Sequence, residues 1–252
     1  MVRGTAASKS DQGFETQSGE PRASRAIAGL QTPGMTDKSR DHTRSIRVGP
    51  GPLALWIKRV FDLVLGTLLL VPAVPVGVVI GLFVRRTSKG PVLFRQARVG
   101  RHGEEFEILK FRTMVHDADL RKQDLKTVSE ADGLFKIRAD PRVTPIGTFL
   151  RQTYLDELPQ LINVMRGEMS LVGPRPLPVE EVHRFQDDAH RRRLSVPPGL
   201  TCLWQVRGRN EIDDFDDWVR LDLEYIDNWS LWLDAKILVA TVPAVLLGRG
   251  GR

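Results

Sequence analysis

One stretch of the chain constrains the fold more than any other. Residues 63–84 are 22 consecutive residues without a charge, and most of them are apolar. A straight helix of this length reaches about 33 Å, which is enough to cross the hydrocarbon core of a bilayer. Pro72 and Pro75 lie in its middle, and each removes a helix hydrogen bond. The run therefore predicts two short apolar arms joined at a break.

Basic residues flank this run on both sides. Lys58 and Arg59 precede it, and Arg85, Arg86 and Lys89 follow it. Positive charge marks the cytoplasmic side of a membrane segment. Both ends therefore favour the same side, which a re-entrant helix–break–helix satisfies. A kinked transmembrane helix and a buried core helix remain as alternatives.

Charge and cysteine content narrow the class of protein. The 37 Lys and Arg residues outnumber the 31 Asp and Glu residues, which gives a net charge of +6 and suits an anionic partner. The basic residues are dispersed and form no known nucleic-acid motif, so we expect no nucleic-acid partner. Cys202 is the single cysteine of the sequence, which excludes an intramolecular disulfide and a Cys-rich zinc site.

The first 50 residues differ from the rest. Residues 1–50 are rich in Gly, Ser, Thr, Arg and Asp, and they show neither helical nor strand periodicity. They also lack the apolar core of a secretory signal. We therefore predict a disordered tail over 1–50 and a folded domain over 51–252, with the re-entrant membrane helix at about 58–86.

The remaining patterns predict an α+β fold that is mainly helical, with the re-entrant helix–break–helix, a small β-hairpin and surface amphipathic helices. Alternating apolar residues around RVGRHG predict the hairpin over 91–115. Thr144-Pro145 is typical of a helix start and Gly167 of a helix end, which predicts two helices over 144–167. Further expectations are a polar helix and loop over 116–139, a helix over 179–193 and a helical region over 216–247.

The adjacent carboxylates Asp156 and Glu157 are the strongest candidates for chemistry. Pro159 is tolerated only in the first turn of a helix, which places Asp156 at or just before a helix N-terminus. Two hard carboxylates together suit Mg²⁺, and one carboxylate can attack phosphorus. The structural alternative is a helix cap followed by a surface residue.

Cationic residues nearby strengthen the functional interpretation. Arg151 precedes the pair, and Arg175 is held between Pro174 and Pro176, which stiffen the backbone around a guanidinium suited to phosphate. A structural ion pair is the alternative for Arg175.

Two further cations, Lys110 and Arg112, lie beside the predicted hairpin. We expect them at a phosphate site together with the two prolines, with a solvated strand face as the alternative. An acidic run over 213–217 lacks calcium-loop spacing and favours a solvated helix start.

The sequence resembles the monotopic polyprenyl-phosphate phosphoglycosyl transferases, a bacterial sugar transferase family, in its exopolysaccharide-initiating branch. The residues that carry the resemblance are Lys58-Arg59-x-Phe61-Asp62, GPVLFRQARVG at 90–100, KFRTM at 110–114, DPRVTPIGTFLRQTYLDELPQLINVMRGEMSLVGPRP at 140–176, PGLTCLWQVRGRN at 198–210 and LDLEYIDNWSLWLDAKIL at 221–238. They cover about three quarters of the chain.

The resemblance implies a mechanism. Asp156 would attack the β-phosphorus of a UDP-sugar and release UMP, and polyprenyl (undecaprenyl) phosphate would then collect the phosphosugar from Asp156. Glu157, with Asp156, would hold Mg²⁺, and Arg151 and Arg175 match family arginines that contact phosphate. The enzyme would sit on the cytoplasmic face of the inner membrane, in contact with membrane lipids.

Several alternatives stay open at this point. A non-catalytic membrane scaffold of a polysaccharide assembly complex would use the same membrane segment. An ordinary glycosyltransferase would release UDP instead of UMP. The sugar is open, and so is the oligomeric state, for which a homodimer is one option.

Overall fold

The computed structural model describes residues 50–118, 120, 140–182, 188–208 and 215–246. The described part belongs to one compact unit, Arg47–Arg252. The tail predicted over 1–50 and most of the helix and loop predicted over 116–139 lie outside the described residues.

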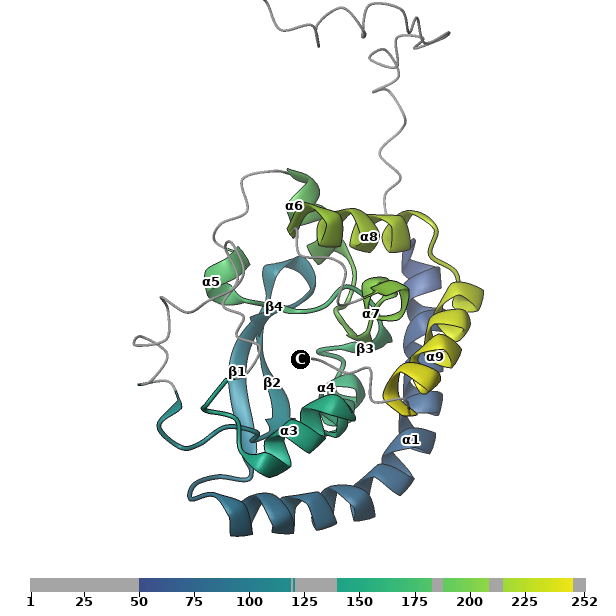
Figure 1. The fold of residues 1–252 in the computed structure, drawn as a ribbon. Coiled ribbons are helices and arrows are strands. Elements are labelled where there is room, and N and C mark those ends of the chain that lie inside the picture. Colours follow the sequence, from purple (N-terminus) through teal and green to yellow (C-terminus); the bar gives the residue numbers. More distant parts are fainter. Residues whose placement is uncertain (1–49, 119, 121–139, 183–187, 209–214, 247–252) are drawn as a thin grey trace, which may run out of the picture. The chain divides into compact units, whose positions relative to one another are not determined.

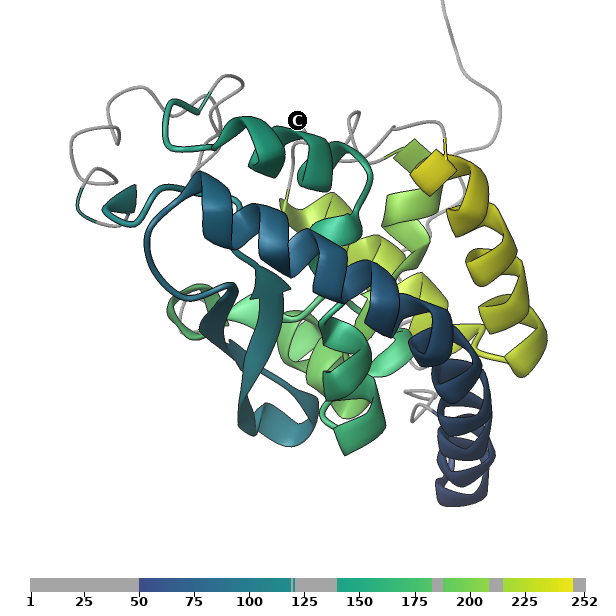
Figure 2. The same cartoon turned by 90° about the horizontal axis from the view of Figure 1, so that it is seen from below.

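Helix α1, Pro52–Thr87, contains the whole apolar run and corrects the predicted break. Its helical assignment continues through Pro72 and Pro75, so the two arms form one helix. The ribbon bends along its length: it descends on the right of Figure 1 and then turns beneath the rest of the molecule, and Figure 2 shows the same bend. Two prolines in a helix remove hydrogen bonds and cause such a bend without ending the helix.

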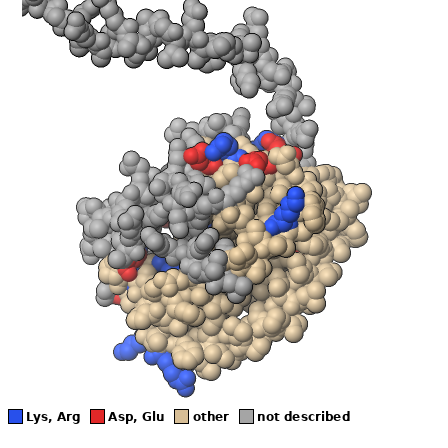
Figure 3. All heavy atoms as spheres, turned by 45° about the vertical axis from the view of Figure 1, so that its right-hand side comes forward, with Lys and Arg blue, Asp and Glu red and all other residues tan. Residues whose placement is uncertain are grey.

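Most of the apolar surface of α1 is exposed. Within the described residues, α1 is the one helix long and apolar enough to cross a membrane, and only 11% of its most apolar window is buried. Figure 3 shows the side of the molecule on which α1 and α9 (Leu231–Leu246) lie, and its described surface is mostly free of charged side chains. Exposed apolar patches of this kind mark a membrane or protein contact.

Polar side chains fasten the first arm of α1 to the rest of the protein. Lys58 Nζ lies 2.6 Å from Asp234 Oδ2 of α9, and both side chains are buried. Asp234 also accepts hydrogen bonds from the hydroxyl of Tyr225 (2.8 Å) and the indole of Trp229 (3.3 Å). One turn later, Asp62 Oδ1 accepts from the backbone N–H of Leu171 (3.1 Å). The charged residues before the apolar run therefore serve as internal anchors.

The predicted hairpin is confirmed. Strands β1, Leu93–Val99, and β2, Glu105–Phe111, pair antiparallel, with Leu93 opposite Phe111 and Val99 opposite Glu105. A short 3-10 turn, η1 (Arg101–Gly103), joins them. The short strand β4, Leu177–Pro178, pairs with the other edge of β1, which leaves β2 at the edge of the three-stranded sheet.

The two helices predicted over 144–167 are confirmed, with one shift. Helix α3, Pro145–Gln152, is capped by Thr144, whose hydroxyl accepts from the N–H of Gly147 at 3.0 Å. Helix α4, Gln160–Arg166, ends at Gly167, which takes the left-handed conformation with φ 87°. Between them lies a single 3-10 turn, η3 (Leu155–Glu157).

The C-terminal half adds short elements around a second, two-stranded parallel sheet. This sheet pairs β3, Ser170–Val172, with β5, Gly199–Thr201. For the helix predicted over 179–193, residues 179–182 and 188–192 are helical, and residues 183–187 lie outside the described part. The helical region predicted over 216–247 is confirmed as two helices, α8 and α9. The bounds of the remaining elements are α5 Val179–Val182, α6 Asp188–Arg192, η4 Arg193–Ser195, α7 Leu203–Gly208 and α8 Phe215–Asp227.

We expect the buried Lys58–Asp234 pair to be a major contributor to stability. Lys58→Met leaves a buried, unneutralised carboxylate and should lower the free energy of unfolding by about 3 kcal/mol. The measurement is urea unfolding of the detergent-solubilised protein. The matched control is Arg95→Met, which removes an exposed pair with Glu107 and should change stability by less than about 1 kcal/mol. Equal stability of the two variants would contradict the anchoring role.

Candidate active site

The carboxylate pair lies on η3, the tight turn between α3 and α4. Tyr154, with φ 57°, reverses the chain direction just before it, and the N–H of Glu157 donates to the carbonyl of Tyr154 at 3.0 Å. Leu155 and Leu158 pack against the apolar cluster of α1 and β2. This packing leaves Asp156 and Glu157 buried against the polar side of β2, at 8% and 7% exposure.

The position of the pair differs from the expected helix N-terminus. Helix α4 begins at Gln160, and Pro159 is its capping residue, so Asp156 lies a turn earlier and does not cap α4. The field of α4 is therefore not the main source of positive potential at the carboxylates. Cationic side chains from other elements supply it.

Lys110 of β2 is the first of these cations. Its Nζ lies 2.7 Å from Glu157 Oε1 and 3.9 Å from Asp156 Oδ2. Asn163 of α4 fixes this register, because its amide accepts from the N–H of Leu109 (3.1 Å) and donates to the carbonyl of Glu107 (2.7 Å) on the free edge of β2. The packing of α4 on β2 thus sets Lys110 between the two carboxylates.

Arg175 and Arg151 complete the cationic surroundings. Arg175 Nη2 lies 3.5 Å from Glu157 Oε1. Arg151 of α3 donates from Nε to the hydroxyl of Thr113 at 2.9 Å, and its charge acts on Asp156. The structure therefore brings together five of the predicted site residues, namely Lys110, Arg151, Asp156, Glu157 and Arg175.

Arg112 has a different environment from the one expected. Its guanidinium donates to the carbonyl and hydroxyl of Ser88 and to the carbonyl of Pro91. These contacts tie the end of α1 to the start of the hairpin. Arg112 follows the last residue of β2, where the chain leaves the strand. These contacts are structural, and the phosphate contact of Arg112 stays a prediction.

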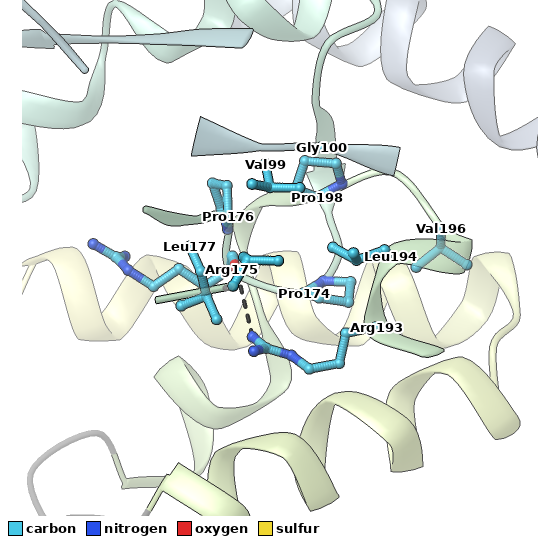
Figure 4. A pocket seen from close by; sticks show the side chains of 11 residues that line it. Val99, Gly100, Pro174, Arg175, Pro176, Leu177, Arg193, Leu194, Val196 and Pro198 are labelled. Carbon is cyan, nitrogen blue, oxygen red and sulfur yellow. Dashed lines mark hydrogen bonds between the residues drawn. The ribbon is translucent and has the colours of Figure 1, made fainter. Parts of the chain in front are cut away.

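Pro174 and Pro176 shape the backbone that carries Arg175. Figure 4 shows them lining a small pocket together with Val99 and Leu177, while the side chain of Arg175 leaves this pocket. The loop packs closely on the segment before β5, since a Cβ at Gly173 would lie 2.5 Å from the carbonyl oxygen of Pro197. The prolines therefore act on the direction of Arg175.

Burial and charge shift the pKa values of the site. Burial raises the pKa of Asp156 above its ordinary 3.8, although the charge of Lys110 opposes this rise. Burial lowers the pKa of Lys110, against the attraction of Glu157. Burial also opposes the charge on Arg175, but the attractions of Glu157, Cys202 and Asp156 together outweigh it and raise the pKa of Arg175. Such opposed shifts in neighbouring groups are typical of functional sites.

Sequence reasoning missed two arginines near the site. Burial and the neighbouring charge of Arg175 lower the pKa of Arg98, on β1, to about 10. Arg193 of η4 is buried and donates to the carbonyl of Arg175 at 3.4 Å. Arg98 stands in a segment that carries the family resemblance, but no spacing in the sequence distinguishes it from the other basic residues.

The carboxylate pair fits a magnesium ion by its chemistry. Mg²⁺ is usually held by one or two carboxylates together with substrate phosphates and water. Among the described residues, no group of three or more acidic, His or Cys side chains is placed to hold a metal. Asp156 and Glu157 would therefore hold the ion with help from a phosphate-bearing substrate.

Comparisons with known proteins place the chain among bacterial sugar transferases. The family model described as bacterial sugar transferase matches residues 53–248. The galactosyl transferase CpsE of Streptococcus agalactiae serotype III (strain NEM316) is 50% identical over 168 residues, which are 66% of this chain and 37% of CpsE. The undecaprenyl-phosphate galactose phosphotransferase of Salmonella typhimurium is 43% identical over 196 residues, 76% of this chain and 40% of that protein.

A shorter relative is covered almost completely. The exopolysaccharide production protein ExoY of Rhizobium meliloti (strain 1021) is 40% identical over 204 residues, which are 79% of this chain and 89% of ExoY. The chain thus spans about two fifths of the two longer relatives and most of ExoY.

We expect Lys110 to keep Asp156 ionised at lower pH. Lys110→Gln removes the cation that most lowers the pKa of Asp156, so this pKa should rise further above 3.8 and the carboxylate should protonate at higher pH. The measurement is a ¹³C NMR titration of labelled aspartate carboxyls, with the Asp156 signal assigned from Asp156→Asn. Arg95→Gln is the control. An Asp156 titration that stays in place in Lys110→Gln would refute this coupling.

Proposed function

The chain belongs to the bacterial sugar transferase family, and we propose that it transfers a phosphosugar from a UDP-sugar to polyprenyl (undecaprenyl) phosphate, in the first membrane step of exopolysaccharide assembly. The observation that carries this proposal is the buried Asp156 beside Glu157, with Lys110 and Arg175 at their oxygens. A carboxylate kept ionised among cations is suited to attack a phosphorus atom.

The first chemical step forms a bond and breaks one at the same phosphorus. A carboxylate oxygen of Asp156 attacks the β-phosphorus of the UDP-sugar. The bond from this phosphorus to the bridging oxygen breaks, and UMP leaves with that oxygen and its electron pair. The phosphosugar remains on Asp156 as an acyl-phosphate.

The second step regenerates the carboxylate. A phosphate oxygen of polyprenyl phosphate attacks the phosphorus held on Asp156, and the bond from phosphorus to the carboxylate oxygen breaks. The product is a polyprenyl diphosphate sugar. No proton needs to be removed from either attacking group when both are ionised.

The charge of the site supports a pyrophosphate donor. Lys110, Arg151 and Arg175 outnumber the two carboxylates, and Arg98 lies close enough to feel the charges of Arg175 and Glu157. Phosphoryl transfer depends mainly on positioning and on charge stabilisation, which fixed guanidinium groups provide. Mg²⁺, held by Asp156 and Glu157, would add charge neutralisation at the substrate phosphates.

The exposed surface of α1 supports a location at the membrane. We propose that α1 enters and leaves the cytoplasmic leaflet of the inner membrane from the same side. The bend at its middle, the exposed apolar surface, and Arg85 and Arg86 in its last turn support this topology, whereas Lys58 before the apolar run is paired inside the protein. A site at this depth would meet the phosphate of a polyprenyl acceptor at the level of the lipid headgroups.

The alternatives differ in what they require of the site. A non-catalytic scaffold has no need for a buried carboxylate pair with matched cations, which are costly to bury. An ordinary glycosyltransferase breaks the bond between the sugar and phosphate and releases UDP. The nucleotide released therefore separates these functions.

We expect the wild-type protein, with polyprenyl phosphate, Mg²⁺ and a panel of UDP-sugars, to release UMP from one donor. Asp156→Asn should lower this rate by about 10³-fold or more, because the amide cannot serve as the nucleophile. The measurement is chromatography of the released nucleotide together with trapping of ³²P from β-labelled donor on the protein. Arg95→Gln is the control, and EDTA should stop turnover until Mg²⁺ is restored.

Two outcomes would contradict this mechanism. Release of UDP would indicate plain glycosyl transfer. Near-normal UMP release by a folded Asp156→Asn variant would show that Asp156 is not the nucleophile.

The proposed topology has its own test. In a Cys202→Ala background, cysteines at Gly51→Cys and Lys89→Cys flank α1 and should both react with a membrane-impermeant maleimide from the cytoplasmic side alone. The measurement compares intact spheroplasts with inverted vesicles. Labelling of the two positions from opposite sides would indicate a transmembrane helix instead.

A further inference from the structure

The loop that carries Arg175 lies between β3 and β4, and its backbone is bound from several sides. Pro174 and Pro176 have no backbone N–H, so the loop offers its carbonyl groups as the main points of attachment. Three successive carbonyls accept hydrogen bonds. The donors are Gly199 N to Pro174 (2.8 Å), Arg193 Nη2 to Arg175 (3.4 Å) and Arg98 Nη1 to Pro176 (3.0 Å).

Arg193 approaches the loop from below in Figure 4, where a dashed line marks its bond to the carbonyl of Arg175. Its guanidinium is itself fixed by Asp222 of α8, with Nε 2.8 Å and Nη2 2.6 Å from Asp222 Oδ2. Both side chains are almost fully buried. The same Nη2 therefore joins the carboxylate of Asp222 to the backbone of Arg175.

Arg98 of β1 holds the next carbonyl of the loop, that of Pro176, at 3.0 Å. Gln96 Oε1 accepts from Arg98 Nη2 at 2.7 Å and fixes the guanidinium. The guanidiniums of Arg98 and Arg193, which come from separate elements, thus donate hydrogen bonds to neighbouring carbonyls of a loop only a few residues long.

We propose that Arg193, oriented by Asp222, and Arg98 are positioning residues that fix the backbone of Arg175 and so aim its guanidinium at Glu157 and at the substrate phosphate. This inference rests on the proposed function of the site. The side chain of Arg175 leaves the pocket while its backbone is held inside it, which separates the anchoring of this residue from its contact with the ligand. A backbone fixed before the ligand binds loses little entropy on binding.

The structure offers a matched control for Arg193. The preceding residue, Arg192, pairs with Asp227, which is also on α8. Both ion pairs therefore join the segment 188–195 to α8, but Arg193 also donates a hydrogen bond to the carbonyl of Arg175. If Arg193 only fastened this segment to α8, the Arg193–Asp222 pair and the Arg192–Asp227 pair would have the same function and would differ only in burial.

Arg193→Lys is the first test, because lysine keeps the positive charge near Asp222 but its single ammonium group cannot reproduce the guanidinium bridge. The probe is UDP, whose binding to the detergent-solubilised full chain is measured by calorimetry in the presence of Mg²⁺. We expect binding to weaken by about tenfold in Arg193→Lys and by no more than about twofold in Arg192→Lys. Similar losses in the two variants would overturn the proposal.

The decisive comparison repeats Arg193→Lys in an Arg175→Ala background. If Arg193 acts through Arg175, the tenfold effect should disappear there, because the side chain that it positions is gone. The same loss in both backgrounds would show a merely structural role and overturn the proposal. UDP binding by Arg175→Ala equal to that of wild type would overturn it as well.

Two further variants test the other residues of the network, and a folding control accompanies every variant. Asp222→Asn should reproduce the Arg193→Lys loss, and Arg98→Lys tests the other side of the loop in the same two backgrounds. Circular dichroism and thermal unfolding identify any variant that does not fold. Failure of the proposed function has a different signature, since wild type would then bind UDP without releasing UMP, while the coupling to Arg175 would still be measured by binding.

Discussion

The site depends on the burial of two adjacent carboxylates, which is tolerated because cationic side chains surround them, with Lys110 the nearest. Lys110 Nζ is 2.7 Å from Glu157 and 3.9 Å from Asp156, so its strongest attraction goes to the second carboxylate. Asp156 is left with the weaker contact and a pKa raised by burial. Much of the surrounding fold maintains this arrangement: Asn163 sets the register of α4 on β2, and the leucines of η3 face the apolar cluster.

Helix α1 combines two requirements that usually belong to different proteins. Its first arm is anchored by buried charges, Lys58 and Asp62, as in the interior of a water-soluble domain. Its middle exposes apolar side chains as a membrane segment does. The second arm returns to the core, where Ile80 and Val84 pack against Phe111 of β2 and Leu150 of α3. The same helix therefore connects the exposed apolar surface with the cluster that supports the carboxylate turn.

Local patterns predicted those parts of the structure that local chemistry decides. The hairpin, the Thr144 cap and the Gly167 helix end follow from nearest neighbours in sequence, and all three are confirmed. The break expected at Pro72 and Pro75 is a bend, because neighbouring turns of a long helix tolerate two lost hydrogen bonds. Arg112 follows Lys110 by two residues in the same motif. Of these two cations, Lys110 contacts the carboxylates, whereas Arg112 contacts Ser88. Lys110 lies in β2, whereas Arg112 follows the end of this strand. The residue spacing in a single sequence does not predict where the strand ends.

The proline-flanked Arg175 shows why the supporting residues escape sequence reasoning. The prolines suggest a rigid loop, but proline limits only its own φ and does not fix a loop against the rest of the protein. Fixing it requires donors from elsewhere, and these come from β1, which precedes the loop by about 80 residues, and from η4 and the start of β5, which follow it. Arg193 in turn depends on Asp222 of α8. The position of the Arg175 backbone is therefore a property of the tertiary structure, and the two prolines leave carbonyls as the groups to be bound.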